Sequence, residues 1–231
     1  MSFQSTFWRQ GVFRLVAIGC VLFVLLTAVA MLFYPGGTAT DPTTHGYSFF
    51  TNFFSELGLT QTRTGQPNTV SATLFITALT LAGAALAVFF VVFAQFFVYS
   101  TAGKILSGLG ALFGVLAGIC FIGVAFTPAN LYLRAHGQFV LWAFTAFPIA
   151  ALFYTVAILQ ERQYPKRFAL VFGVFTILLI LYLALLFTGP SFGTAQGLRV
   201  QATGQKAIVY ASIISILIQA VGARQVAQGK L

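Results

Sequence analysis

The stretch Val12–Tyr34, VFRLVAIGCVLFVLLTAVAMLFY, decides the fold of this chain. A membrane core about 30 Å thick is crossed by a helix of about 20 predominantly apolar residues. The stretch has that length and contains a single charged side chain, Arg14. It stops at Pro35-Gly-Gly37, residue types that end a helix. We therefore expect a membrane-spanning helix here.

Five further apolar runs follow, separated by short segments that contain proline, glycine or basic residues. They are expected to span the membrane at residues 68–99, 105–127, 133–160, 168–189 and 206–222. Pro148 lies inside the fourth run and predicts a kink there. The sixth run is the weakest, because Ser212, Ser215 and Gln219 interrupt it. We expect residues 1–231 to form a single transmembrane domain, an all-α integral membrane protein with six transmembrane helices.

The composition supports this class. Hydrophobic residues make up 59% of the chain and charged residues 6%, whereas about 25% of the residues of a soluble domain are charged. The net charge of +9 comes from 12 basic residues scattered between apolar runs, which excludes a nucleic-acid partner. Cys20 and Cys120 lie inside apolar runs, so we expect buried thiols and neither a disulfide nor a metal site. No cofactor is expected.

Basic residues between the runs predict the orientation, because Lys and Arg favour the cytoplasmic side. With the N-terminus inside, eight basic residues are cytoplasmic and four lie on the opposite side. The cytoplasmic set is Arg9, Arg14, Lys104, Arg162, Lys166, Arg167, Arg224 and Lys230, and the opposite set is Arg63, Arg134, Arg199 and Lys206. We therefore expect both termini in the cytoplasm, in agreement with an even number of spans.

The third run carries glycine at every fourth position, at Gly110, Gly114 and Gly118. Small residues at this spacing let helix backbones approach closely in a membrane. We expect a central, tightly packed helix whose partner belongs to the same chain. Homodimerisation through this face is the alternative.

The segment Gly46-Tyr-Ser-Phe-Phe-Thr-Asn-Phe-Phe-Ser-Glu-Leu-Gly58 lies between the first and second runs and contains one of only three acidic residues. Read as a helix, its Phe residues and Leu57 recur at i, i+1, i+4, i+5 and i+8 on one face. Ser48, Asn52 and Glu56 share another face. This pattern is typical of an amphipathic helix that lies in the membrane interface. We expect that helix to cover the extracytoplasmic ends of the spans.

Polar residues gather on the side that the predicted orientation places outside the cytoplasm. They are Asp41, His45, Asn52, Ser55, Glu56, Arg63, Asn68, Asn130, Arg134, His136, Arg199, Gln205 and Lys206. An ionisable side chain at membrane depth is expected to have a partner. We expect Glu56 to pair with His136 or Arg134.

The order of these features resembles the six-span membrane family called domain of unknown function 998, which is distantly similar to the FRAG/DRAM-type eukaryotic membrane proteins. The resemblance rests on Ser55-Glu56-Leu57-Gly58, Asn68, the Gly-rich third run, Phe126-Thr-Pro128 and His136, and it covers essentially the whole chain. The family commonly has an acid shortly after the Phe-x-Pro element, where this chain has Asn130. The resemblance implies a six-span bundle in a prokaryotic cytoplasmic membrane. Some FRAG-type relatives are similar to lipid-anchor remodelling factors, which implies a lipid ligand or substrate.

The first of three functional hypotheses is a non-catalytic protein that binds a membrane lipid or a protein partner through a polar extracytoplasmic pocket. Its ligand-binding candidates are Asn52, Asn68, Asn130, Arg134 and Arg199. A homo-oligomer is a further alternative for the partner.

The second hypothesis is a lipid-modifying enzyme, for acyl transfer or hydrolysis. Its catalytic candidates are Glu56 and His136 as acid–base groups, with Ser55 beside them. A carboxylate at Glu56 that only pins the loop explains the same residue. The third hypothesis, a small-solute transporter, is the least favoured, because transport sites lie near the membrane midplane and no acid is evident at that depth.

Overall fold

The computed structural model describes residues 6–231, apart from the side chain of Arg9. Six helices are long and apolar enough to cross a membrane, and this part of the chain contains no strand. They are α1 (Val12–Leu32), α2 (Thr69–Phe93), α3 (Thr101–Phe126), α4 (Leu133–Gln160), α5 (Arg167–Thr188) and α6 (Ala195–Ala227). Short helical turns are added before α1 (η1, Phe7–Gly11), in the first loop (η2, Phe54–Gly58) and after α2 (η3, Ala94–Phe97). The chain is therefore an all-α, multi-pass membrane protein.

Five of the helices agree with the predicted runs to within a few residues, and α4 runs through the buried Pro148. The sixth prediction was too short, since α6 begins at Ala195 rather than at residue 206. Thr194 caps it, with the hydroxyl oxygen accepting from the Gly197 N–H at 3.1 Å. The early turns of α6 contain polar side chains, of which Gln201 is buried and donates to the Leu185 carbonyl at 2.9 Å. Hydropathy therefore underestimates the length of this helix.

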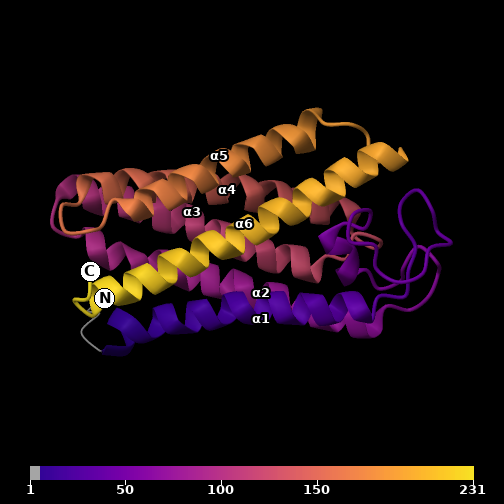
Figure 1. Ribbon diagram of the computed structural model, residues 1–231, viewed down its shortest axis with the longest axis horizontal. Coiled ribbons are helices and arrows are strands. Elements are labelled where there is room, and N and C mark those ends of the chain that lie inside the picture. The colour runs from indigo at the N-terminus through magenta and orange to yellow at the C-terminus, as the bar shows by residue number, and fades with distance from the viewer. Residues whose placement is uncertain (1–5) are drawn as a thin grey trace.

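Each helix packs against the next one in sequence, and α6 returns to α1, so that the six helices close into a ring (Figure 1). The Gln10 amide joins the two terminal segments by donating to the Ala227 carbonyl at 3.2 Å. We call the end of the bundle at which the described chain begins and ends, at residues 6 and 231, the terminal end. The loop of residues 33–68 covers the opposite end, which we call the loop end (Figure 1).

The glycines of α3 bring it close to both neighbouring helices. A Cβ at Gly118 would lie 2.5 Å from the Gly83 carbonyl oxygen of α2, and one at Gly114 would lie 2.2 Å from the ring of Phe90. On the other side, a Cβ at Gly110 would lie 2.6 Å from the ring of Tyr154 in α4. The close packing predicted from the glycine spacing is thus found within the chain.

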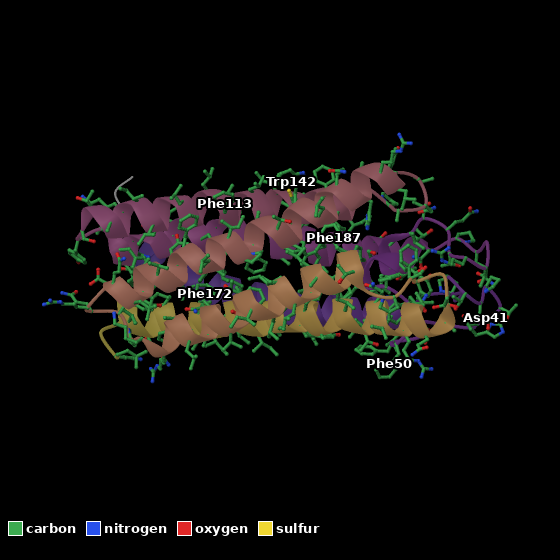
Figure 2. The ribbon with its side chains drawn as sticks, turned by 90° about the horizontal axis from the view of Figure 1, so that it is seen from above. Asp41, Phe50, Phe113, Trp142, Phe172 and Phe187 are labelled. Atoms are coloured by element: carbon green, nitrogen blue, oxygen red, sulfur yellow. The ribbon has the colours of Figure 1, made fainter. Side chains whose placement is uncertain are left out.

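Aromatic rings fill the terminal half of the bundle. Phe90 of α2 stacks on Phe172 of α5 with ring centroids 6.2 Å apart, and on Tyr154 of α4 at 5.5 Å. Phe93 adds a further contact with Tyr154 at 5.0 Å. Figure 2 shows Phe172 in this half, far along the bundle from Asp41 at the loop end. Because this aromatic cluster lies in the terminal half, other contacts must stabilise the loop half of the bundle.

Candidate functional site

The loop of residues 33–68 does not contain the predicted amphipathic helix. Of residues 46–58 only Phe54–Gly58 is helical, as a 3₁₀ turn, and the residues before it form turns. The reason is local competition for backbone hydrogen bonds. The Asn52 side chain accepts from the Ser48 N–H at 2.9 Å, and the Glu56 carboxylate accepts from the Phe53 N–H at 2.8 Å.

The rings of this loop consequently point in different directions. Phe54 and Leu57 are buried, whereas Phe49 and Phe50 are exposed. Figure 2 shows Phe50 on the outside of the loop end. The single apolar face expected from the helical pattern is therefore not formed.

The first part of the loop is a tight backbone turn. The Gly37 N–H donates to the Thr44 carbonyl at 2.8 Å, and the Gly46 N–H donates to the Pro35 carbonyl at 3.0 Å. Gly37 has a φ of +84°, a conformation that favours glycine. Near the tip, the backbone and hydroxyl of Thr43 both donate to the Asp41 carboxylate, and these hydrogen bonds lower the pKa of Asp41.

Glu56 is the buried centre of the loop, with 4% of its surface exposed. One carboxylate oxygen accepts from the Asn52 amide at 2.9 Å and from the Phe53 N–H at 2.8 Å. The other forms an ion pair with Arg63 at 3.1 Å, and the Arg63 side chain is 48% exposed. Burial and then the charge of Glu56 raise the pKa of Tyr34 above its ordinary value. Glu56 therefore connects different residues of its own loop to one another.

The predicted pairing of Glu56 with His136 or Arg134 was wrong. His136 is buried, and its Nδ1 lies 2.7 Å from the Thr127 carbonyl oxygen. A carbonyl only accepts hydrogen bonds, so Nδ1 carries the proton and the ring links the end of α3 to the start of α4. Arg134 is exposed. Glu56 and His136 are thus each paired with residues near them in sequence and not with one another.

Of the three predicted asparagines, Asn52 bonds within the loop, whereas Asn68 and Asn130 attach the loop to the ends of the helices. Asn52 donates to the Gly37 carbonyl at 2.8 Å, and Asn68 donates to the Leu57 and Leu59 carbonyls, both at 2.9 Å. Asn130 lies between α3 and α4. Its amide donates to the Thr60 hydroxyl at 2.7 Å and its carbonyl oxygen accepts from the Thr60 N–H at 3.2 Å. Arg199, the remaining ligand-binding candidate, is exposed on α6.

Two residues of α6 that were not among the predicted site residues complete the attachment. The Gln205 amide oxygen accepts from the Phe54 N–H. Lys206 is 1% exposed, and its ammonium donates to the Asn52 carbonyl and to the Ala202 carbonyl. The ammonium also lies 5.3 Å from the ring centre of Tyr47 and 5.3 Å from that of Phe49, within range of a cation–π attraction.

A pattern in the sequence indicates this face of α6. Its polar residues recur at helical spacing, at Gln201, Gln205, Ser212, Ser215 and Gln219, and all of them are buried. In a membrane, polar side chains turn toward the interior of the bundle. The same residues that made the sixth run look weak therefore mark the side of α6 that faces the other helices.

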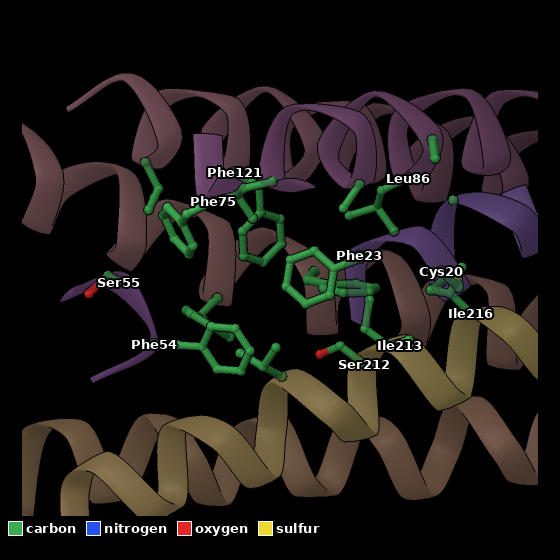
Figure 3. A pocket seen from close by; sticks show the side chains of 18 of the residues that line it. Cys20, Phe23, Phe54, Ser55, Phe75, Leu86, Phe121, Ser212, Ile213 and Ile216 are labelled. Carbon is green, nitrogen blue, oxygen red and sulfur yellow. The ribbon is translucent and has the colours of Figure 1, made fainter. Parts of the chain in front are cut away.

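An apolar cavity of about 100 Å³ lies directly beneath the loop and is lined by residues of α1, α2, α3, α4, α6 and η2. Figure 3 shows the rings of Phe23, Phe54, Phe75 and Phe121 around it, with Cys20 and Ile216 toward the terminal half. Lining residues of α6 run from Gln205 to Ile216, a helical rise of about 16 Å. Among the described residues that line the cavity none is charged. A polar pocket had been expected on this side; the polar side chains instead bind the loop above an apolar space.

The model of a family described as "Protein of unknown function (DUF998)" matches residues 17–221, from within α1 to within α6. The chain belongs to the DUF998 family. The matched residues include the whole loop and every cavity-lining residue except Val16. No curated protein and no solved structure matches this DUF998 chain.

Metal-binding residue types do not gather in the part of this DUF998 protein that the structure describes. Within residues 6–231 no three His, Cys, Asp or Glu side chains lie close enough together to hold a metal ion. Cys20 lines the cavity, and both it and Cys120 are buried free thiols. The cavity and its loop are thus the arrangement from which a function can be argued.

Proposed function

We propose that this DUF998 protein binds a membrane lipid and holds the lipid's hydrocarbon chain in the cavity beneath the loop. The observation that carries the proposal is the cavity itself, which is apolar, elongated and covered at one end by η2. An apolar cavity excludes water and takes apolar ligands. In a membrane the most abundant such ligand is a lipid chain.

Two further points support a lipid ligand. Ligand sites in helical bundles lie between the helices, and this cavity is lined by residues of five of them. The distant similarity to FRAG/DRAM-type proteins that we expect for this family would favour the same class of ligand, since some of those proteins are similar to lipid-anchor remodelling factors.

Catalysis by Glu56, His136 and Ser55 has less support. Glu56 is bonded to Arg63 and to its own loop, and the Nδ1 of His136 is engaged by Thr127. A general base must reach the proton that it removes. Transport has no specific observation in its favour, because no charged residue lines the cavity among the described residues.

Native mass spectrometry of gently purified protein tests the proposal. Ala82→Leu adds bulk to a residue that lines the cavity, whereas Ala84→Leu adds the same bulk to an exposed position on the same helix. We expect one co-purifying lipid class in the wild type and in Ala84→Leu, and its loss in Ala82→Leu. If no lipid is retained, or if both variants lose it equally, the proposal fails and a protein partner or a homo-oligomer becomes the better interpretation.

We further propose that the chain lies in a prokaryotic cytoplasmic membrane with the loop end outside and both termini in the cytoplasm. The excess of basic residues in the segments at the terminal end supports this orientation. Gln66 and Gln163 are exposed at opposite ends of the bundle. In a background without Cys20 and Cys120, an impermeant thiol reagent added to whole cells should label Gln66→Cys and leave Gln163→Cys unlabelled. The reverse labelling would overturn the orientation.

A further inference from the structure

The loop end of the cavity carries two polar side chains from different elements. Ser55 belongs to η2 and Gln205 to α6, and both line the cavity. Figure 3 shows Ser55 at the loop-end margin of the cavity, beyond the rings of Phe54 and Phe75. The remainder of the lining is apolar apart from Ser212, farther along α6. An amphiphile in this cavity would therefore meet its polar contacts at one end only.

Gln205 has an unused hydrogen-bond donor at this end. The Phe54 N–H can only donate, so the atom that it contacts is the amide oxygen of Gln205, and the amide NH₂ is the other group. Among the described residues this NH₂ has no hydrogen-bond partner. The side chain is only 8% exposed, so water provides little compensation. An acceptor on a ligand would give this largely buried donor a hydrogen-bond partner.

The hydroxyl of Ser55 is a second free donor. Within residues 6–231 no hydrogen bond is formed by this hydroxyl. Ser212 provides the contrast, because its hydroxyl donates to the Ile208 carbonyl at 2.8 Å in its own helix. Two donors are thus available at the loop end of the cavity, and the hydroxyl farther along is already used.

The arrangement of charged side chains around this end of the cavity favours a ligand with an uncharged head group. Lys206 follows Gln205 in sequence but is turned to the loop, where it is bonded to the Asn52 carbonyl. The Glu56 charge is neutralised by Arg63. No charged side chain lines the cavity among the described residues, so an ionised head group there would be buried without a counter-charge in contact with it, which is strongly unfavourable.

We propose that Gln205 and Ser55 form a head-group subsite for an uncharged lipid whose ester or alcohol oxygen accepts hydrogen bonds from the Gln205 NH₂ and the Ser55 hydroxyl. The chain of this lipid extends along α6 toward Ile216. This inference rests on the proposed function and adds to it the chemical class of the ligand.

A competition experiment on the full-length protein in detergent tests the subsite. A photoreactive fatty alcohol labels the cavity. The three competitors have the same chain length and are a fatty alcohol, the corresponding alkane and the ionised fatty acid. Each hydrogen bond contributes a few-fold in affinity, so we expect the alcohol to compete about tenfold better than the alkane in the wild type. The ionised acid should compete less well than the alcohol.

Three variants test which side chains cause the preference for alcohol over alkane. Ser55→Ala removes one donor, and Gln205→Glu removes the other while keeping an oxygen for the Phe54 N–H. Both should reduce the preference for alcohol over alkane toward one. Ser212→Ala is the matched control, since its hydroxyl also lines the cavity but is bonded to Ile208, and it should keep the wild-type preference. Ser55→Ala leaves the bond between Gln205 and Phe54 in place, so it remains informative if Gln205→Glu does not fold.

The outcomes separate this inference from the proposed function. Specific labelling of the cavity with equal competition by alcohol and alkane would overturn the head-group subsite and leave the lipid-binding function standing. Stronger competition by the ionised acid would also overturn it. Absence of cavity labelling by the probe in every protein would overturn the proposed function and the subsite with it.

Discussion

The two ends of the bundle use phenylalanine in opposite ways. In the terminal half, the rings of Phe90 and Phe172 stack on one another in the centre, and Gly114 of α3 makes room for the ring of Phe90. In the loop half, the rings of Phe23 and Phe75 line a cavity instead of filling it. The same residue type therefore provides dense packing at one end and the wall of an apolar cavity at the other.

The forces that hold the two ends also differ. The terminal half is stabilised by the packing of apolar rings, which depends on the filling of space. The loop end is held by hydrogen bonds, one ion pair and a buried ammonium, through Glu56, Asn130 and Lys206. We expect substitutions in the terminal half to lower global stability, and substitutions at the loop end to release the loop with a smaller effect on the helices.

The largest effect is expected from Phe172→Ala in the terminal half. This ring is fully buried and contacts three rings of α2, so its removal should lower the free energy of unfolding by about 3–5 kcal/mol. Thermal unfolding in detergent measures it. Phe187→Ala, on the exposed face of the same helix, is the matched control and should change little. Equal losses in both variants would mean that the rings of the terminal half do not form the stabilising core.

An intermediate effect is expected from Glu56→Gln at the loop end. The substitution removes one acceptor from a buried, charged hydrogen-bond network and should cost about 1–3 kcal/mol. Arg63→Gln should cost about 0–1 kcal/mol, because the Arg63 side chain is half exposed to solvent. Unfolding and limited proteolysis of the loop measure both variants. A larger loss in Arg63→Gln would show that the ion pair, rather than the hydrogen bonds inside the loop, holds Glu56.

A small effect, similar to that of Arg63→Gln, is expected from Asn130→Ala. Its two hydrogen bonds to Thr60 are exposed, so the loss should be about 0.5–1.5 kcal/mol. Hydrogen exchange should accelerate at Thr60 and remain unchanged in the terminal halves of the helices. Faster exchange throughout α3 and α4 would contradict the separation of the two ends, because it would make this contact part of the core.

The helices were predictable because their signal is local. A run of apolar residues long enough to cross a membrane has one stable conformation there, since every backbone group must be bonded within the run. Gly110, Gly114 and Gly118 likewise predicted close packing, because the absence of a side chain acts wherever the helix meets a neighbour. Hydropathy misplaced the start of α6, where polar residues are buried against other parts of the chain.

The sequence by itself therefore determined six membrane-spanning helices, their order and the polar character of the first loop. Only the tertiary structure decided that this loop is not a long helix, that Glu56 pairs with Arg63, and that Gln205 and Lys206 attach the loop to α6. The apolar cavity, too, depends on which residues of five helices face one another. The physical reason is distance along the chain: burial of an apolar run depends on its own residues, whereas a buried polar group takes whichever partner the fold brings near.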